Sequence, residues 1–192
     1  MAGTGGRAGG GARGEKRLPL PLEREAREAL RAGDRILLSG RMITARDQAH
    51  RRLVEMLERG EPLPVRLAGE TVYYAGPSPA PEGRASGSVG PTTAARMDPF
   101  TPRLAAEGLA ACIGKGPRSA ETRRALRESG VLYLVGVGGA AALLGSRVRA
   151  IRVAAFPELG PEAVYELEVE DFPVIVGYDL VGGDVFSHLE NI

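Results

Sequence analysis

Residues 109–137 read LAACIGKGPRSAETRRALRESGVLYLVGV, and this stretch decides the fold. Two apolar runs, residues 109–113 and 131–137, flank a charged run that begins after Ser119 and stops at Gly130. The apolar runs predict buried strands, and the serine and glycine are typical of a helix start and a helix stop. Strand, helix and strand in this order imply parallel pairing through a right-handed crossover. The sequence therefore predicts an α/β fold with parallel strands.

The pattern extends outward from this stretch in both directions. On the N-terminal side we expect an extended edge segment at 18–22, helices at 23–31, 44–59 and 101–107, and strands at 35–39, 63–67 and 70–75. Gly40 is expected to end the strand 35–39, Thr44 to cap the next helix with Asp47 in a capping box, and residues 68–69 to form a hairpin turn.

The last third of the chain has a different pattern. Residues 148–155, 163–169 and 173–178 predict strands joined by short connections. Short connections are typical of antiparallel neighbours, whereas parallel neighbours need a long crossover. We therefore expect a mixed sheet, or two sheets, rather than a doubly wound sheet.

Composition indicates one domain, expected over residues 18–192. Residues 1–17 are mostly Gly, Ala and Arg, so they lack the apolar content that offsets the entropy of ordering, and a disordered tail is predicted. The formal net charge of +1 argues against a general nucleic-acid or membrane-surface binder, with a basic tail that touches nucleic acid as the alternative. No membrane-spanning apolar run and no signal-peptide core is present, which favours a soluble cytoplasmic protein.

The single cysteine, Cys112, excludes an intrachain disulfide and a multi-cysteine metal site within this chain. Its apolar strand predicts a core residue, and no metal ligands are expected here. Residues 136–139, Gly-Val-Gly-Gly after a strand, are only a fragment of a dinucleotide fingerprint. Close packing or a subunit contact over residues 136–142 is the favoured interpretation of these glycines.

A long Gly/Ser/Pro loop within residues 73–97 is the first candidate for ligand binding. Gly87 and Gly90 allow close approach of the backbone to a ligand. Thr92 or Thr93 is placed to cap a short helix, whose N-terminus attracts anions. Arg96 would lie one turn further on the same face. The pattern predicts a pocket for a small anion with a hydroxyl group at its centre.

Two further cations, and a histidine, are candidates with open alternatives. Lys115 lies between two glycines just after a buried strand, where α/β sheets bind ligands, so it is either an anion ligand or an ordinary loop lysine. The Walker spacing is absent. Arg46 lies in the first turn of its helix, where the dipole disfavours a cation, so it either points at an anion or is solvated. His50 either supports the ligand-binding groups or is structural.

Five motifs occur in order and carry a resemblance to a known family. They are Thr44-Ala45-Arg46-Asp47-x-Ala49-His50, Tyr74-Ala75-Gly76-Pro77, Gly87-x-x-Gly90-Pro91-Thr92-Thr93-x-x-Arg96-Met97-Asp98, Gly114-Lys115-Gly116 and Glu170-Asp171-Phe172-Pro173. Over residues 18–190 the chain resembles the β subunit of two-subunit class I fumarate hydratases and L-tartrate dehydratases. It is equally similar to the C-terminal domain of single-chain class I fumarases.

The resemblance implies a swivelling β/β/α-type three-layer domain with a partly parallel central sheet. It implies a hydro-lyase of four-carbon dicarboxylates, in which a partner α subunit carries a [4Fe-4S] cluster and the assembly is an α2β2 heterotetramer. By motif, Arg46, Thr93, Arg96 and Lys115 bind substrate, and Thr92 is the proposed base. Asp47 and His50 lie behind these ligands. Ala95 stands where family members often have Gly or Ser, a change between small residues.

Elementary chemistry agrees with these roles but leaves alternatives. Arginine forks and a lysine suit a dianion, and positive charge stabilises the aci-carboxylate that forms when a proton leaves the neighbouring carbon. A threonine hydroxyl acts as a base only if nearby cations shift its pKa, so a simple hydrogen bond from Thr92 or Thr93 to substrate is the alternative. Fumarate and tartrate are not distinguished by the sequence, and a non-catalytic anion-binding module is a third interpretation.

Overall fold

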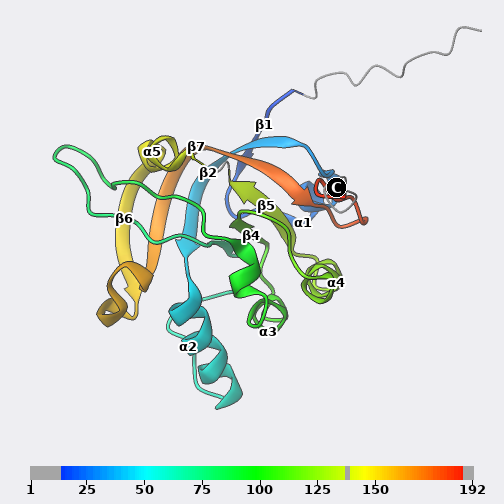
Figure 1. Cartoon of the computed structure of the whole chain (residues 1–192), viewed down its shortest axis with the longest axis horizontal. Coiled ribbons are helices and arrows are strands. Elements are labelled where there is room, and N and C mark those ends of the chain that lie inside the picture. Colours follow the sequence, from blue (N-terminus) through cyan, green and yellow to red (C-terminus); the bar gives the residue numbers. More distant parts are fainter. Residues whose placement is uncertain (1–13, 137–138, 188–192) are drawn as a thin grey trace, which may run out of the picture.

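The computed structural model describes residues 14–136 and 139–187. Within these residues, one mixed sheet has the strand order β1-β2-β3-β4-β5-β7-β6 (Figure 1). The strands are β1 (Lys16–Pro19), β2 (Arg35–Thr44), β3 (Thr71–Tyr73), β4 (Ala111–Gly114), β5 (Leu132–Gly136), β6 (Val148–Ala155) and β7 (Val164–Tyr178). Most of the tail predicted over residues 1–17 lies outside the described residues.

The sheet closes on itself through its longest strand. Strands β1 to β5 pair in parallel, and β7 runs antiparallel to β5, to β6 and to β2. Because β7 pairs with both β5 and β2, the strands β2, β3, β4, β5 and β7 form a barrel-like closure. The predicted mixed α/β sheet is thus confirmed, whereas the described strands do not form a clear three-layer stack.

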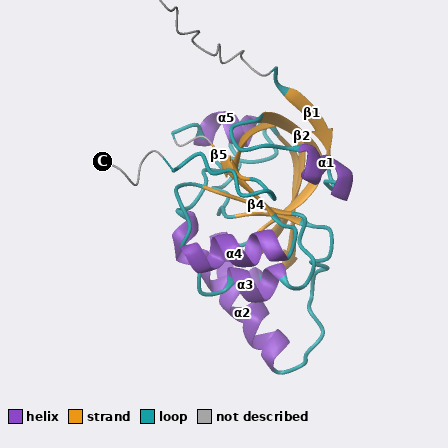
Figure 2. Ribbon diagram, turned by 90° about the vertical axis from the view of Figure 1, so that its right-hand side faces the viewer, coloured by secondary structure: helices purple, strands orange, loops and turns teal. Residues whose placement is uncertain are grey.

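Three helices cover one side of this closure. They are α2 (Asp47–Glu58), α3 (Thr101–Ala105) and α4 (Ala120–Glu128), and Figure 2 shows them stacked beside one another against the strands. The helices α1 (Arg24–Ala29) and α5 (Ala141–Ser146) lie away from this stack. Two short 3-10 helices, η1 (Ala94–Met97) and η2 (Pro157–Glu162), precede α3 and β7.

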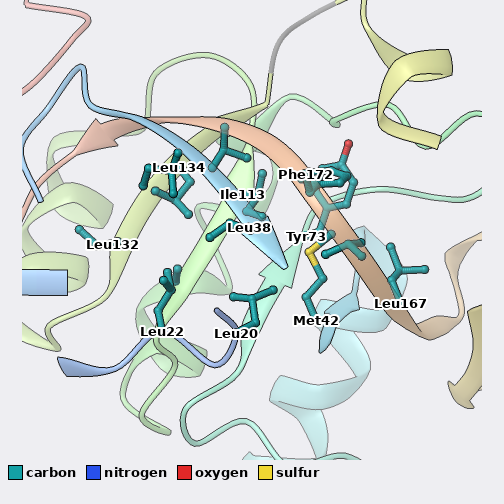
Figure 3. Close-up of a cluster of buried hydrophobic side chains, with 14 of the residues drawn as sticks. Leu20, Leu22, Leu38, Met42, Tyr73, Ile113, Leu132, Leu134, Leu167 and Phe172 are labelled. Carbon is teal, nitrogen blue, oxygen red and sulfur yellow. The ribbon is translucent and has the colours of Figure 1, made fainter. Parts of the chain in front are cut away.

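Alternation along the strands builds two hydrophobic clusters. Leu132 and Leu134 belong to the cluster shown in Figure 3, whereas Tyr133 between them belongs to a second cluster together with Leu53 and Leu126 of the helices. Successive side chains of a strand point to opposite faces, so each strand feeds both clusters. The apolar run that looks uniform in the sequence is therefore buried on both faces, as in parallel sheets.

The strand–helix–strand unit predicted from residues 109–137 is confirmed. β4 and β5 pair in parallel, and α4 lies between them in the chain. Ser119 caps α4, since its Oγ accepts a hydrogen bond from Thr122 N at 3.1 Å. The predicted helix with Pro102 in its first turn is also present, as α3.

Four local predictions were wrong. Two of them were wrong because strands continue through residues with a positive φ. Gly40 does not end its strand: β2 passes through it with a φ of 124° and a register shift, and a Cβ there would lie 2.8 Å from Leu20 O. The predicted strands 163–169 and 173–178 are one strand, β7, which passes through Asp171 at a φ of 50°. Both positions match local bulges, where a strand bends without ending.

The other two errors concern a strand and a helix cap. Residues 63–67 form no strand, because Pro62 and Pro64 remove backbone donors, so the turn at residues 68–69 does not join two strands as a hairpin would. Thr44 is the last residue of β2 rather than a cap, and its Oγ1 accepts a hydrogen bond from Tyr165 N. The N-cap position of α2 is occupied by Arg46, without a side-chain cap.

Candidate active site

The candidate residues follow the carboxyl ends of three adjacent parallel strands. Arg46 comes two residues after β2, Gly76 comes three residues after β3, and Lys115 follows β4 directly. Strands β2, β3 and β4 are neighbours in the sheet, so their carboxyl ends meet along one edge. Ligands of α/β sheets bind at such edges.

Backbone hydrogen bonds join the loop that carries Thr92 and Thr93 (the threonine loop) to the loop that carries Lys115 (the lysine loop). Thr92 N donates to Tyr74 O at 2.6 Å, Lys115 N donates to Thr92 O at 3.1 Å, and Ala94 N donates to Lys115 O at 2.9 Å. Thr92 and Thr93 are therefore held beside Lys115. Gly114 permits this approach, since a Cβ there would lie 2.8 Å from Ala94 Cβ. The exposed Lys115 ammonium has no ion-pair partner among the described residues.

Arg96 projects from η1 toward the start of α2. Its Nε and Nη2 donate to the two carboxylate oxygens of Asp47 at 3.0 and 2.7 Å, and both side chains are partly exposed. The predicted helix that follows the threonines is present, but Thr93 at its N-cap makes no side-chain cap bond and Thr92 lies outside it. The two threonine hydroxyls are thus not used to cap η1.

Arg46 is packed against the end of β3 rather than extended into solvent. Its side chain is 24% exposed and lies 3.8 Å from Glu162 Oε1. A Cβ on Gly76 would lie 2.7 Å from the backbone oxygen of Pro161 and 2.8 Å from Arg46 Nη1, so the absence of a side chain at Gly76 lets the guanidinium pack closely there. Arg46 Nε is buried with no hydrogen-bond partner. This arginine therefore retains one donor that forms no hydrogen bond to the described residues.

The His50 side chain is buried and packs at the start of α2. Its Nδ1 donates to Arg46 O at 3.0 Å, and its ring meets the Tyr74 ring edge-on at 5.1 Å between centroids. Burial lowers the pKa of His50 from 6.5 to about 4. The imidazole is therefore neutral near pH 7, so it serves as a hydrogen-bond donor and adds no charge to the site.

Sequence analysis missed Arg118, the most buried cation of the region. Its side chain is 0% exposed, and its Nε donates to Asp98 Oδ1 at 2.6 Å. Its guanidinium lies between the rings of Tyr74 and Tyr133, at 5.3 Å from each centroid. A single arginine gives no spacing signal, and its partner Asp98 lies 20 residues away in the sequence.

The residues of this chain do not fit an iron–sulfur cluster. Cys112 is completely buried, and burial raises the pKa of its thiol. Within residues 14–136 and 139–187, no group of three His, Cys, Asp or Glu side chains is placed to hold a metal ion. No helix in the same described part has the length and apolarity needed to cross a membrane. The subunit contact predicted over residues 136–142 includes Val137 and Gly138, which lie outside the described residues.

Comparisons with known proteins identify relatives. The family model described as Fumarase C-terminus matches residues 13–189. Fumarate hydratase 2 of Leishmania major is 42% identical over 171 residues, which is 88% of this chain and 30% of that protein. The aerobic class I fumarate hydratase of Escherichia coli K12 is 42% identical over 158 residues, 81% of this chain and 29% of that protein.

A third relative is similar in length to the chain itself. The L(+)-tartrate dehydratase subunit beta of Escherichia coli K12 is 33% identical over 178 residues, which is 90% of this chain and 87% of that protein. The chain thus spans about 30% of the fumarate hydratases that it matches but most of this subunit.

Proposed function

The chain belongs to the Fumarase C-terminus family, and we propose that it is the carboxylate-binding part of a carbon–oxygen hydro-lyase. The reaction proposed is the reversible hydration of fumarate to L-malate. In this proposal the chain is a β subunit, and its partner, the α subunit, supplies the rest of the active site. The family's swivelling β/β/α arrangement is part of the same proposal.

One observation carries this proposal. Arg46, Thr92, Arg96 and Lys115 come from separate parts of the sequence, yet backbone and side-chain contacts gather them at the carboxyl ends of β2, β3 and β4. A four-carbon dicarboxylate carries two negative charges, and each needs a cationic partner when it leaves water. Arg46, Arg96 and Lys115 supply three positive charges, of which Asp47 and Glu162 offset part.

The donors that remain free indicate how substrate is held. Arg96 commits Nε and Nη2 to Asp47, so it presents its Nη1 side to a ligand. Lys115 offers all three ammonium protons beside Thr92 and Thr93. We assign the carboxylates to Arg46, Arg96 and Lys115, with Thr93 donating a hydrogen bond. Asp47 orients Arg96, and His50 orients Arg46 through its carbonyl oxygen.

Thr92 is assigned as the base. In the dehydration direction its alkoxide takes a proton from the carbon beside a carboxylate, and the electron pair of the broken C–H bond is held in that carboxylate as an aci-carboxylate. The pair then returns to form the C=C bond as hydroxide leaves the next carbon with the electrons of its C–O bond. Transfer of the proton from Thr92 to this hydroxide releases water and restores the alkoxide. Lys115 stabilises both the alkoxide and the aci-carboxylate, because positive charge favours each developing anion. The neutral His50 does not compete for this proton because it is buried.

The leaving hydroxide needs a Lewis acid, and we propose that the partner α subunit holds it as a [4Fe-4S] cluster. Such a cluster with one open iron site needs three thiolates, and this chain has one cysteine. Exposure of Arg96 and Lys115 supports a site that is completed across an interface. An α2β2 heterotetramer in the cytoplasm is the assembly that we propose.

A specific observation also favours L-tartrate dehydratase as a second candidate. The relative whose length the chain nearly spans is named as a tartrate dehydratase subunit beta, whereas the higher identities are to fumarate hydratases. Both substrates are four-carbon dicarboxylates, so the same three cations serve either of them. The choice between them rests on contacts to a second hydroxyl group.

The test is a steady-state assay of the complex with its cluster-bearing partner, using malate and L-tartrate side by side. The proposal predicts a higher kcat/KM for malate. A preference for tartrate transfers the assignment to the second candidate. No turnover of either substrate by a confirmed complex with an intact cluster contradicts the hydro-lyase proposal and leaves a non-catalytic anion-binding module.

A further inference from the structure

We propose that Arg118 is a positioning residue that sets the placement of Arg96 relative to Lys115, a role that rests on the proposed function. Its side chain is 0% exposed, so it does not reach a substrate. It acts instead through the two loops that carry the exposed cations.

The guanidinium of Arg118 connects three segments. Nε donates to Asp98 Oδ1 at 2.6 Å, Nη2 to Thr101 Oγ1 at 2.6 Å, and Nη1 to Tyr74 Oη at 3.3 Å. Asp98 lies two residues after Arg96, and Tyr74 is the residue whose carbonyl oxygen accepts Thr92 N. The backbone of Arg118 itself lies three residues after Lys115. The Arg118 side chain thus connects the lysine loop to the end of η1, the helix that carries Arg96, and to the end of β3.

Additional hydrogen bonds fix the lysine loop at both ends. Asp98 Oδ2 accepts from Ser119 N at 2.8 Å, so the carboxylate that holds Arg118 also holds the start of α4. Tyr178 Oη accepts from Arg118 N at 2.9 Å, and Tyr133 Oη donates to Gly116 O at 2.7 Å. The loop from Lys115 to Ser119 is therefore anchored from the buried side while the Lys115 ammonium stays exposed.

Core stability alone is a weak reason for this arrangement. Burying a cation carries a desolvation cost, and well-packed apolar groups often replace buried ion pairs without loss of stability. What an arginine adds is a planar fork that reaches several acceptors in fixed directions, which a lysine ammonium does not reproduce. Two of the acceptors of Arg118, Asp98 and Tyr74, lie in the segments that carry the candidate site, so the geometry that it fixes includes that of the site.

The first measurement is amide hydrogen exchange on the full chain, and it needs no activity. The amides of Ala94 and Lys115 join the two loops, so they report directly on their registration. In Arg118→Lys we expect these two amides to lose protection by more than the global unfolding equilibrium explains. Leu126→Ala is the matched control, since Leu126 is buried in the cluster that contains Tyr74 and Tyr133, the two rings on either side of Arg118. There we expect any loss at these amides to follow global stability only.

The second measurement is steady-state malate dehydration by the complex with its iron–sulfur partner. Misplacement of binding groups by about 1 Å costs up to roughly 10²-fold, so we expect Arg118→Lys to lower kcat/KM by about 10- to 100-fold. A residue that acts through Lys115 has little left to disturb once that ammonium is gone. In a Lys115→Ala background the same substitution should therefore lower kcat/KM by less than about threefold.

The two measurements distinguish a failure of the positioning role from a failure of the proposed function. Unchanged protection of the Ala94 and Lys115 amides in Arg118→Lys overturns the positioning role, whatever the activity. Equal losses of kcat/KM in the wild-type and Lys115→Ala backgrounds overturn it as well, because they indicate a general loss of folded protein. A wild-type complex that converts no dicarboxylate contradicts the proposed function, while hydrogen exchange still decides whether Arg118 holds the two loops together.

Discussion

Replacing Arg96 by alanine should reduce catalysis much more than stability, because the guanidinium of Arg96 forms its ion pair with Asp47 at the surface. The Arg96 side chain is 49% exposed and that of Asp47 is 26% exposed. Ion pairs of this kind contribute about 0–1 kcal/mol to folding. The free energy of unfolding of Arg96→Ala, measured in urea, should therefore fall by no more than about 1 kcal/mol.

The effect on catalysis should be far larger. In the proposed site Arg96 pairs with a carboxylate that loses its water when substrate binds, and removing one partner of such a pair costs about 2–5 kcal/mol. At about 1.36 kcal/mol for each factor of ten, kcat/KM for malate should fall roughly 30- to 5,000-fold. Lys115→Ala should lose activity over the same range, because its ammonium is proposed to bind the same dianion.

Arg59→Ala is the matched control for this prediction. Arg59 uses the same two nitrogens, Nε and Nη2, to hold Glu61 at 2.7 and 3.0 Å, and it is 54% exposed. It directly follows the last residue of α2, at the opposite end of the helix from Arg46. Its loss should leave kcat/KM near the wild-type value. Near-normal kcat/KM in both Arg96→Ala and Lys115→Ala would refute the site assignment.

Two other predictions concern the base and pH. Thr92→Ala should lower kcat more than it raises KM, because a base acts in the transition state, and Thr93→Ala should have a smaller effect on kcat. If steady-state kinetics show the larger loss of kcat in Thr93→Ala, the base is Thr93 rather than Thr92. The pKa of His50 falls from 6.5 in the unfolded chain to about 4 in the fold, so stability decreases as pH falls between these values. The loss amounts to about 3 kcal/mol. Urea unfolding should show a smaller loss in His50→Gln, and identical pH profiles would contradict a neutral buried histidine.

The parallel core could be predicted because its signals are local. Ser119 bonds to its own helix, and the apolar runs around it are long enough to identify strands buried on both faces. Once parallel neighbours are established, their carboxyl ends must share an edge, so the gathering of Arg46 and Lys115 follows from topology.

The closure of the sheet could not be predicted from local patterns. Gly40 and Asp171 read as strand ends, yet they lie within the two longest strands. Asp171 N donates to Ser39 Oγ at 3.0 Å across the β2–β7 ladder. This bond joins residues far apart in the chain, and no spacing rule describes it. Tertiary pairing therefore decides whether such a residue ends a strand or bends it.

Arg118 was missed for a similar reason. Its burial depends on Tyr74, Asp98 and Tyr133, which lie in three separate segments of the chain. In the sequence it is one arginine in a loop that contains glycine and proline. Charged residues are seldom fully buried, so the prior favours an exposed side chain. The positions of Arg46 and Lys115 after strands could be predicted from the sequence, whereas the burial of Arg118 could not.

The most direct test of the split site uses the chain, its iron–sulfur partner with the cluster rebuilt, and their mixture. Malate dehydration is measured anaerobically for each sample, and complex formation in the mixture is confirmed by light scattering. Our account predicts no turnover by the chain alone and turnover in the mixture, because it assigns the cationic pocket and the Lewis acid to different subunits. Turnover by the chain alone would contradict it.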